Sequence, residues 1–224
     1  MVTTSSARVG PGPLIERWAP LGGILYVGLF IVGTILLFGG TPDGDATPAK
    51  VVAWYRDSGH RDRVGFGWVL AGLGLFFFLW FVGALREVIR SIDGDGLYAR
   101  MTTIGGTVYA SLALAAIALN MGIRTMSDDT YQHEVYPDLI HAANDAGYVL
   151  HATGGAGAAA MIFAATLAAM RARRIAPWLG WLGLLCGLGA LASIAFFPQL
   201  LLALWIVVAS VALLRFRPGP VVPA

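Results

Sequence analysis

Five polar side chains fall on one side of a predicted membrane helix, at spacings that would let them act together. They are His141, Asn144, Asp145, Tyr148 and His151. At about 100° per residue they lie within an arc of about 120° on a helix otherwise rich in Ala and Gly. Asp145 is the one acidic residue within any predicted span, and an ionisable group there is costly unless it has a partner or meets water. These residues are therefore the candidate ligand or proton site.

Two interpretations of this stripe need no metal. The preceding span ends with Asn120 and Arg124 on the same side of the membrane, so antiparallel packing would bring Arg124 close to Asp145 as an ion pair. Alternatively, His151, Asp145 and His141 would form a relay of protonatable groups toward the outside, because histidine titrates near neutral pH. The sequence leaves both interpretations open.

The third interpretation is a metal site. His141 and Asp145 stand at i and i+4 of the helix, and His133 or His60 from the loops would be a third ligand. Imidazole and carboxylate together suit Zn, Fe or Cu, and we expect no other cofactor. The helix offers two ligands without strain whereas a site needs at least three, so this interpretation depends on the loop histidine.

The composition excludes a soluble domain. Of the 224 residues, 57% are hydrophobic and 12% are charged, and the mean hydropathy is +0.71. A soluble chain carries about a quarter of charged residues. The net charge of +2 comes from bases that flank apolar runs, so we expect no nucleic-acid binding. The single cysteine, Cys186, lies within an apolar run and excludes an intramolecular disulfide.

Six apolar stretches are long enough to cross a bilayer, whose core of about 30 Å takes about 20 helical residues. The predicted spans are residues 21–40, 64–85, 101–123, 139–170, 178–197 and 199–214. The last two form one uncharged stretch that would be about 55 Å long as a single helix, so we place a hairpin at Pro198. The expected fold is an all-α bundle of six transmembrane helices over residues 21–217, between tails of residues 1–20 and 218–224.

The distribution of basic residues predicts the orientation. Ten arginines lie on the side of the two termini, and five Lys or Arg residues lie on the other side. Because cytoplasmic segments carry the excess of Lys and Arg, both termini are predicted to be cytoplasmic, in a bacterial plasma membrane. The histidine stripe then belongs to the outer half of the protein.

The first outer segment predicts a short surface helix. Thr47 and Pro48 match an N-cap followed by proline at the first helical position. The apolar residues that then gather on one side are Val51, Val52, Trp54 and Tyr55. We therefore predict an amphipathic helix over residues 47–57 on the outer membrane surface.

Several segments together resemble a known family. They are Thr41-Pro42-Asp43-Gly44-Asp45-Ala46-Thr47, Val51-Val52-Ala53-Trp54-Tyr55-Arg56, His60-Arg61 and Trp80-Phe81-Val82-Gly83-Ala84-Leu85-Arg86. This pattern, within roughly the first hundred residues, is similar to a family of uncharacterised multi-pass membrane proteins common in actinobacteria. The resemblance implies an integral membrane protein and brings no function.

Three function classes follow from these features. We expect a binding or accessory subunit, whose polar pocket on the extracytoplasmic side takes a small ligand, a lipid or a partner. The alternatives are a small proton-coupled transporter and a metal-dependent membrane enzyme. The sequence leaves enzymatic activity open and favours a role without it. The expected partners are membrane lipids and a protein partner or second copy within the membrane.

Overall fold

The regular structure of this chain is helical. The computed structural model describes residues 18–128, 135–193 and 199–215. Its helices are α2 (Leu21–Phe38), α3 (Pro48–Arg56), α4 (Ser58–Asp93), α5 (Leu97–Met126), α6 (Pro137–Arg171), α7 (Pro177–Leu191) and α8 (Gln199–Arg215). No strand occurs within these ranges, which confirms the all-α prediction.

Four helices, α2, α4, α5 and α6, are long and apolar enough to cross a membrane. The longest, α4 and α6, have 36 and 35 residues, or about 54 and 52 Å, which exceeds a hydrocarbon core of about 30 Å. The apolar helices α7 and α8 have 15 and 17 residues, or about 22 and 26 Å. The six expected spans thus correspond to four long helices and two short ones. The turn expected at Pro198 lies outside the described residues.

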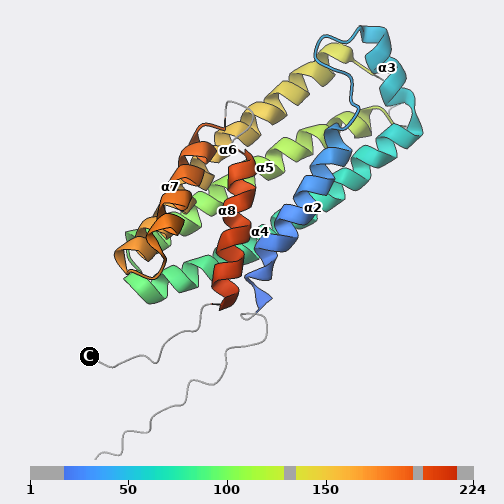
Figure 1. Cartoon of the computed structure of the whole chain (residues 1–224). Coiled ribbons are helices and arrows are strands. Elements are labelled where there is room, and N and C mark those ends of the chain that lie inside the picture. Colours follow the sequence, from blue (N-terminus) through green and yellow to red (C-terminus); the bar gives the residue numbers. More distant parts are fainter. Residues whose placement is uncertain (1–17, 129–134, 194–198, 216–224) are drawn as a thin grey trace, which may run out of the picture.

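The helices pack mainly against their neighbours in sequence (Figure 1). The central pair, α4 and α5, runs antiparallel; α2 packs on α4 and α6 packs on α5. On the remaining side α7 packs on α6, and α8 lies between α7 and α2. Most of the large side chains that are fully buried come from α4 and α6, among them Leu75, Phe78, Phe81, Met161 and Ile162.

Glycines let these helices approach until their backbones touch. A Cβ on Gly157 of α6 would lie 2.7 Å from the Gly105 carbonyl oxygen of α5. A Cβ on Gly33 of α2 would lie 2.6 Å from the backbone nitrogen of Ala71 in α4. Close approach of this kind increases dispersion contacts between helices that lipid cannot drive together by the hydrophobic effect. It also fixes the register of each helix pair.

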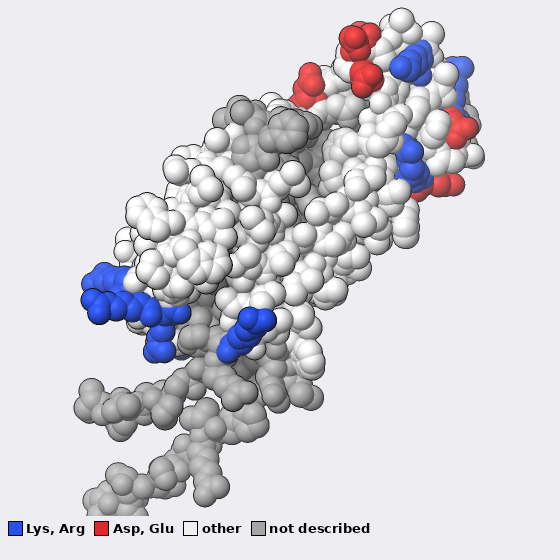
Figure 2. Space-filling model, in the orientation of Figure 1, with Lys and Arg blue, Asp and Glu red and all other residues white. Residues whose placement is uncertain are grey.

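We name the end of the bundle that carries α3 the α3 end, and the end where α6 meets α7 the opposite end. On the face shown in Figure 2, basic side chains gather at the opposite end and side chains of both signs gather at the α3 end. The surface between them is free of charge on that face. This distribution matches a bundle with an apolar middle and two wet ends.

The short helix expected near residues 47–57 is present as α3, but its surroundings differ from the prediction. Val51 and Tyr55 are buried against Ile123 of α5 and Ile140 of α6. Its apolar side therefore packs on the bundle itself and does not face lipid. The reason is the length of α5 and α6, whose ends reach far enough to supply an apolar surface.

Candidate functional site

The five residues of the expected stripe all lie in α6, in the half nearer the α3 end. Their burial divides them into two groups. Asp145 and Tyr148 are exposed, whereas His141, Asn144 and His151 are partly buried. The two groups face different neighbours, so the stripe is better described as two adjacent surfaces.

The exposed group lies on the side of α6 that packs against α7 further along the helix. Eighteen residues make about five helical turns, so positions eighteen apart point the same way. This step relates Asp145 to Phe163 and Tyr148 to Thr166. Phe163 and Thr166 contact glycines of α7. Asp145 and Tyr148 therefore extend the α7-packing side of α6 toward the α3 end.

Within the described residues, the contact between the α7 segment and this side of α6 ends near Ser193. The Ser193 hydroxyl donates hydrogen bonds to the carbonyls of Ala152 (3.1 Å) and Ala190 (2.7 Å). Tyr148 is one turn of α6 beyond Ala152, and its exposed fraction is 41%. We call the surface formed by Asp145 and Tyr148 the α6 face.

The position of the α6 face along the bundle is set by its contact with α5. Gly147, between Asp145 and Tyr148, packs against the Ala116 carbonyl of α5. Ala116 precedes Arg124 by eight residues, or about 12 Å along α5. Within the described residues the Asp145 carboxylate makes no ion pair or hydrogen bond. A carboxylate that is exposed to lipid tails is costly unless it has a polar neighbour.

His151 belongs to a buried aromatic group within the bundle. Its ring stacks on Phe30 of α2, with 5.7 Å between centroids, and meets the edge of Tyr109 of α5 at 5.8 Å. The Tyr109 hydroxyl hydrogen-bonds the Tyr26 hydroxyl of α2. Tyr109 is about 22 Å along α5 from Arg124, so this group lies well inside the bundle and away from the α3 end.

Asn144 connects α6 to α3. Its side chain hydrogen-bonds the Tyr55 hydroxyl, which stands at the α3 end outside the spans. Burial raises the pKa of Tyr55 above its ordinary value, and the bond with Asn144 lowers it in part. The Asn144 side chain therefore helps to hold α3 against α6, which is a structural role.

The expected pair between Arg124 and Asp145 does not form. The Arg124 guanidinium lies 3.5 Å from the Asp62 carboxylate, and its Nε donates to the Arg61 carbonyl at 2.9 Å. The side chain therefore faces α4, because α5 contacts both α4 and α6 and is rotated so that this position points to α4. Asn120 is buried and donates to the Ala116 carbonyl within its own helix.

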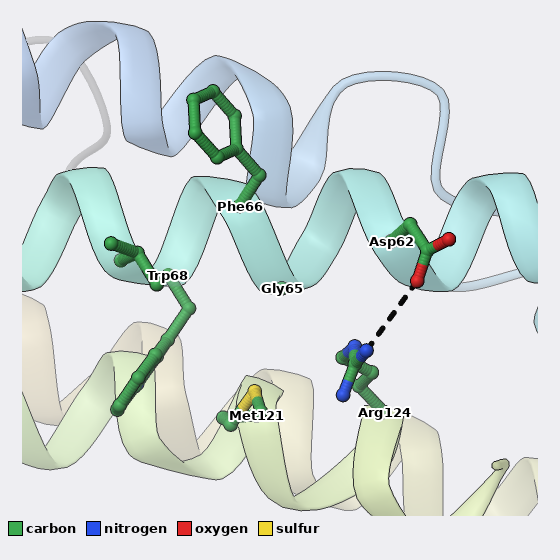
Figure 3. Close-up of a pocket in the computed structure, with 7 residues that line it drawn as sticks. Asp62, Gly65, Phe66, Trp68, Met121 and Arg124 are labelled. Atoms are coloured by element: carbon green, nitrogen blue, oxygen red, sulfur yellow. Dashed lines mark hydrogen bonds and ion pairs between the residues drawn. The ribbon is translucent and has the colours of Figure 1, made fainter.

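Arg124 lines a shallow pocket of about 370 Å³ between α4 and α5 (Figure 3). Figure 3 shows the guanidinium turned toward Asp62, with Met121 beside it on the same helix. A Cβ on Gly65 would lie 2.8 Å from the Arg124 Nε, so glycine leaves the room for this side chain to reach α4. Asp62 is largely exposed, and a pair of this kind contributes about 1 kcal/mol or less.

Sequence reasoning missed two arginines that organise the α3 end. Arg61 is 7% exposed and donates to the carbonyls of Tyr55 (3.0 Å) and Arg56 (2.7 Å), the last turn of α3. Arg63 donates to the Gly39 carbonyl after α2, and its guanidinium lies 5.7 Å from the centre of the Trp54 ring. Helix C-termini attract cations through their free carbonyls. The sequence feature that could have indicated this role is the group of arginines close to the ends of two helices.

The described residues do not form a set of ligands that would support a metal site. Among the described residues no group of three or more His, Cys, Asp or Glu side chains is placed to hold a metal ion. His133 lies outside the described residues, so the site of His141, Asp145 and His133 stays a prediction. His60, the alternative third ligand, lies in the first turn of α4, where its ring stacks on Trp54 with 4.6 Å between centroids.

Comparison with known proteins adds no relative to this description: no family model, no curated protein and no solved structure matches the chain.

Proposed function

We propose that this chain is an accessory subunit of a bacterial plasma membrane, and that the α6 face is the surface where it binds a membrane helix of a partner. In this proposal both termini are cytoplasmic and the α3 end is extracytoplasmic. The helices α7 and α8 supply the fifth and sixth crossings. The positive-inside rule supports this orientation, because the termini share their side with most arginines.

The observation that carries the proposal is the exposed carboxylate of Asp145 on a helix side that packs against α7 elsewhere. Closer to the opposite end, the same side of α6 packs against a helix, because small residues of α7 contact it. A partner helix in line with α7 would continue this packing. A hydrogen-bond donor or a cation on that helix would remove the cost of leaving Asp145 in lipid.

A partner helix fits the α6 face better than an enclosed small ligand. The two best-defined cavities among the described residues are lined by other side chains. The α6 face is convex, as a single helix surface is, and one helix surface binds another through its grooves. A second copy of this chain is an alternative occupant that the test below separates.

The test is photo-crosslinking from Tyr148 in native membranes. A photoreactive phenylalanine derivative at Tyr148 is expected to give a discrete product of higher mass, whose protein content mass spectrometry identifies. The matched control is the same group at Leu114, an exposed residue of α5 with an exposed fraction of 41%. That position should give only lipid adducts.

The substitution Asp145→Arg sharpens this test. It reverses the charge at an exposed position and is expected to abolish the crosslink from Tyr148 without unfolding the protein. A product of twice the chain mass would identify a second copy as the occupant. Absence of any discrete product, or a product that survives Asp145→Arg, would overturn the proposal.

A small proton-coupled carrier is the second candidate, and one observation favours it. Tyr26, Tyr109 and His151 form a protonatable group deep within the bundle, on three different helices. Such groups mark proton pathways in carriers. Proteoliposomes that hold a pH-sensitive dye would show proton entry dependent on His151 if the chain were a carrier. Equal rates with His151→Gln would exclude this role.

A further inference from the structure

A second apolar site lies at the opposite end of the bundle, far from the α6 face. It is a cavity of about 160 Å³ bounded by α4, α6, α7 and α8. Its lining includes large residues, among them Leu85, Ile89 and Trp205. Small residues on α6, α7 and α8 leave room between them, and these are Ala165, Ala169, Gly183, Ala209 and Ala212.

A cavity with this lining is not suited to water. A buried water needs two to four polar partners, and apolar cavities of about 150 Å³ stay dry but bind small hydrocarbons. By that comparison the cavity accepts a segment of roughly six carbon atoms. Empty, it would leave the side chains around it without dispersion contacts. Hydrocarbon is thus the chemistry that the walls select.

One lining residue is charged. Arg174, in the turn between α6 and α7, is exposed and contributes to the wall. Within the described residues its side chain has no ion pair or hydrogen bond. The position places a free guanidinium at the wet edge of an apolar space. An amphiphile with an anionic head and an alkyl tail has the complementary arrangement.

We propose that this cavity binds one acyl chain of an anionic membrane phospholipid, with the phosphate of that lipid held by Arg174. The proposal is independent of the α6 face, which lies at the other end of the bundle. The ligand would be a lipid of the surrounding bilayer, because the cavity is bounded by membrane helices and Arg174 stands where headgroups lie. Such a lipid would join α8 to α4 and α6.

The test uses Trp205, which lines the cavity and is 7% exposed. Bromine atoms on an acyl chain quench tryptophan fluorescence on contact. The delipidated full-length chain is placed in nanodiscs of phosphatidylcholine that contain a minor fraction of brominated phosphatidylglycerol or, separately, of brominated phosphatidylcholine. The difference between the native chain and Trp205→Phe isolates the signal of this one residue from the other tryptophans.

We expect brominated phosphatidylglycerol to quench Trp205 severalfold more than brominated phosphatidylcholine at the same fraction. Arg174→Gln should lower this preference about fivefold, the effect of one interfacial cation on an anionic lipid. Arg173→Gln is the matched control, because Arg173 carries the same charge, is exposed and does not line the cavity. It should leave the preference unchanged.

Filling the cavity provides the second arm. Ala209→Leu is expected to remove quenching of Trp205 by both lipids, and if that variant does not fold, Ala212→Leu at an exposed part of the wall replaces it. Three results would overturn the proposal. These are the absence of Trp205-specific quenching, quenching that survives the filled cavity, and equal losses in Arg174→Gln and Arg173→Gln, which indicate diffuse attraction of anionic lipid to the basic end.

Discussion

At the α3 end, arginine side chains reach the carbonyls of helix ends, whereas along α5 and α6 glycines bring two backbones into direct contact. The first arrangement uses long side chains with several donors, so a lost bond can be replaced in part by water. The second depends on the absence of any side chain, and the neighbouring backbone cannot move away. The backbone contact between α5 and α6 should therefore tolerate no added volume, whereas the α3 end should respond to substitutions by degrees.

The largest expected effect comes from Gly157→Ala in the middle of the bundle. The new Cβ would lie 2.7 Å from the Gly105 carbonyl oxygen, so α5 and α6 must separate. Overpacking of this kind typically costs about 1–3 kcal/mol, and we expect the upper part of that range. Thermal unfolding in detergent micelles measures the loss.

Gly122→Ala is the control for that substitution, because a Cβ there meets no atom within 4 Å. It should leave the unfolding temperature unchanged or raise it slightly, since alanine favours the helix. Equal losses in both variants would show that contact between α5 and α6 does not set the effect.

The second effect concerns Arg61 at the α3 end. Arg61→Ala leaves the carbonyls of Tyr55 and Arg56 without their donor and is expected to cost about 2 kcal/mol, the value of hydrogen bonds to a charged group. Because α3 is peripheral, the loss should appear as local opening. A cysteine at Val51, which is 1% exposed, reports it through faster reaction with a maleimide in a background without Cys186.

Arg56→Ala removes an exposed arginine of the same helix and should leave the reaction at position 51 unchanged. Arg61→Lys keeps the charge with a single donor group, and its reaction rate at position 51 should lie between those of Arg56→Ala and Arg61→Ala. A rate in Arg61→Ala no faster than in Arg56→Ala would contradict the role of Arg61 in holding α3.

The smallest effect is a pH dependence at Asp57. The bond from the His60 backbone N–H, and the nearby charges of His60 and Arg61, hold the pKa of this exposed carboxyl below its usual range. A carboxyl with a lowered pKa stabilises the fold above about pH 4 and loses that contribution as pH falls through its folded pKa. As the pH is lowered from 5, the unfolding temperature of the native chain should therefore fall slightly more than that of Asp57→Asn. Parallel curves would count against this cap.

Much of the fold could be predicted from the sequence because membranes impose a simple rule on length and polarity. The long spans follow from uncharged runs, and α3 follows from Pro48 and the apolar residues after it. The sequence also placed the polar stripe on a single helix, which α6 bears out. These features depend only on neighbours along the chain.

The partners of individual side chains could not be predicted in the same way. Whether Arg124 meets Asp62 or Asp145 depends on the rotation of α5 between α4 and α6, and both helices offered a carboxylate. The extent to which α7 covers α6 depends on where α7 ends, inside an uninterrupted apolar run. The cavity beside Trp205 arises from small residues on helices distant in sequence. Each of these features is set by packing between elements.

The contact between α2 and α8 has a consequence for how the protein is made. Most helix contacts join neighbours along the chain, so they can form in order as each hairpin leaves the ribosome and enters the membrane. The seam between Gly23 of α2 and Ile206 of α8 is different, because it joins the first described membrane helix to the last. Within the described helices, α2 must therefore wait in the bilayer, with one side open to lipid or to an insertion factor, until α8 has been synthesised.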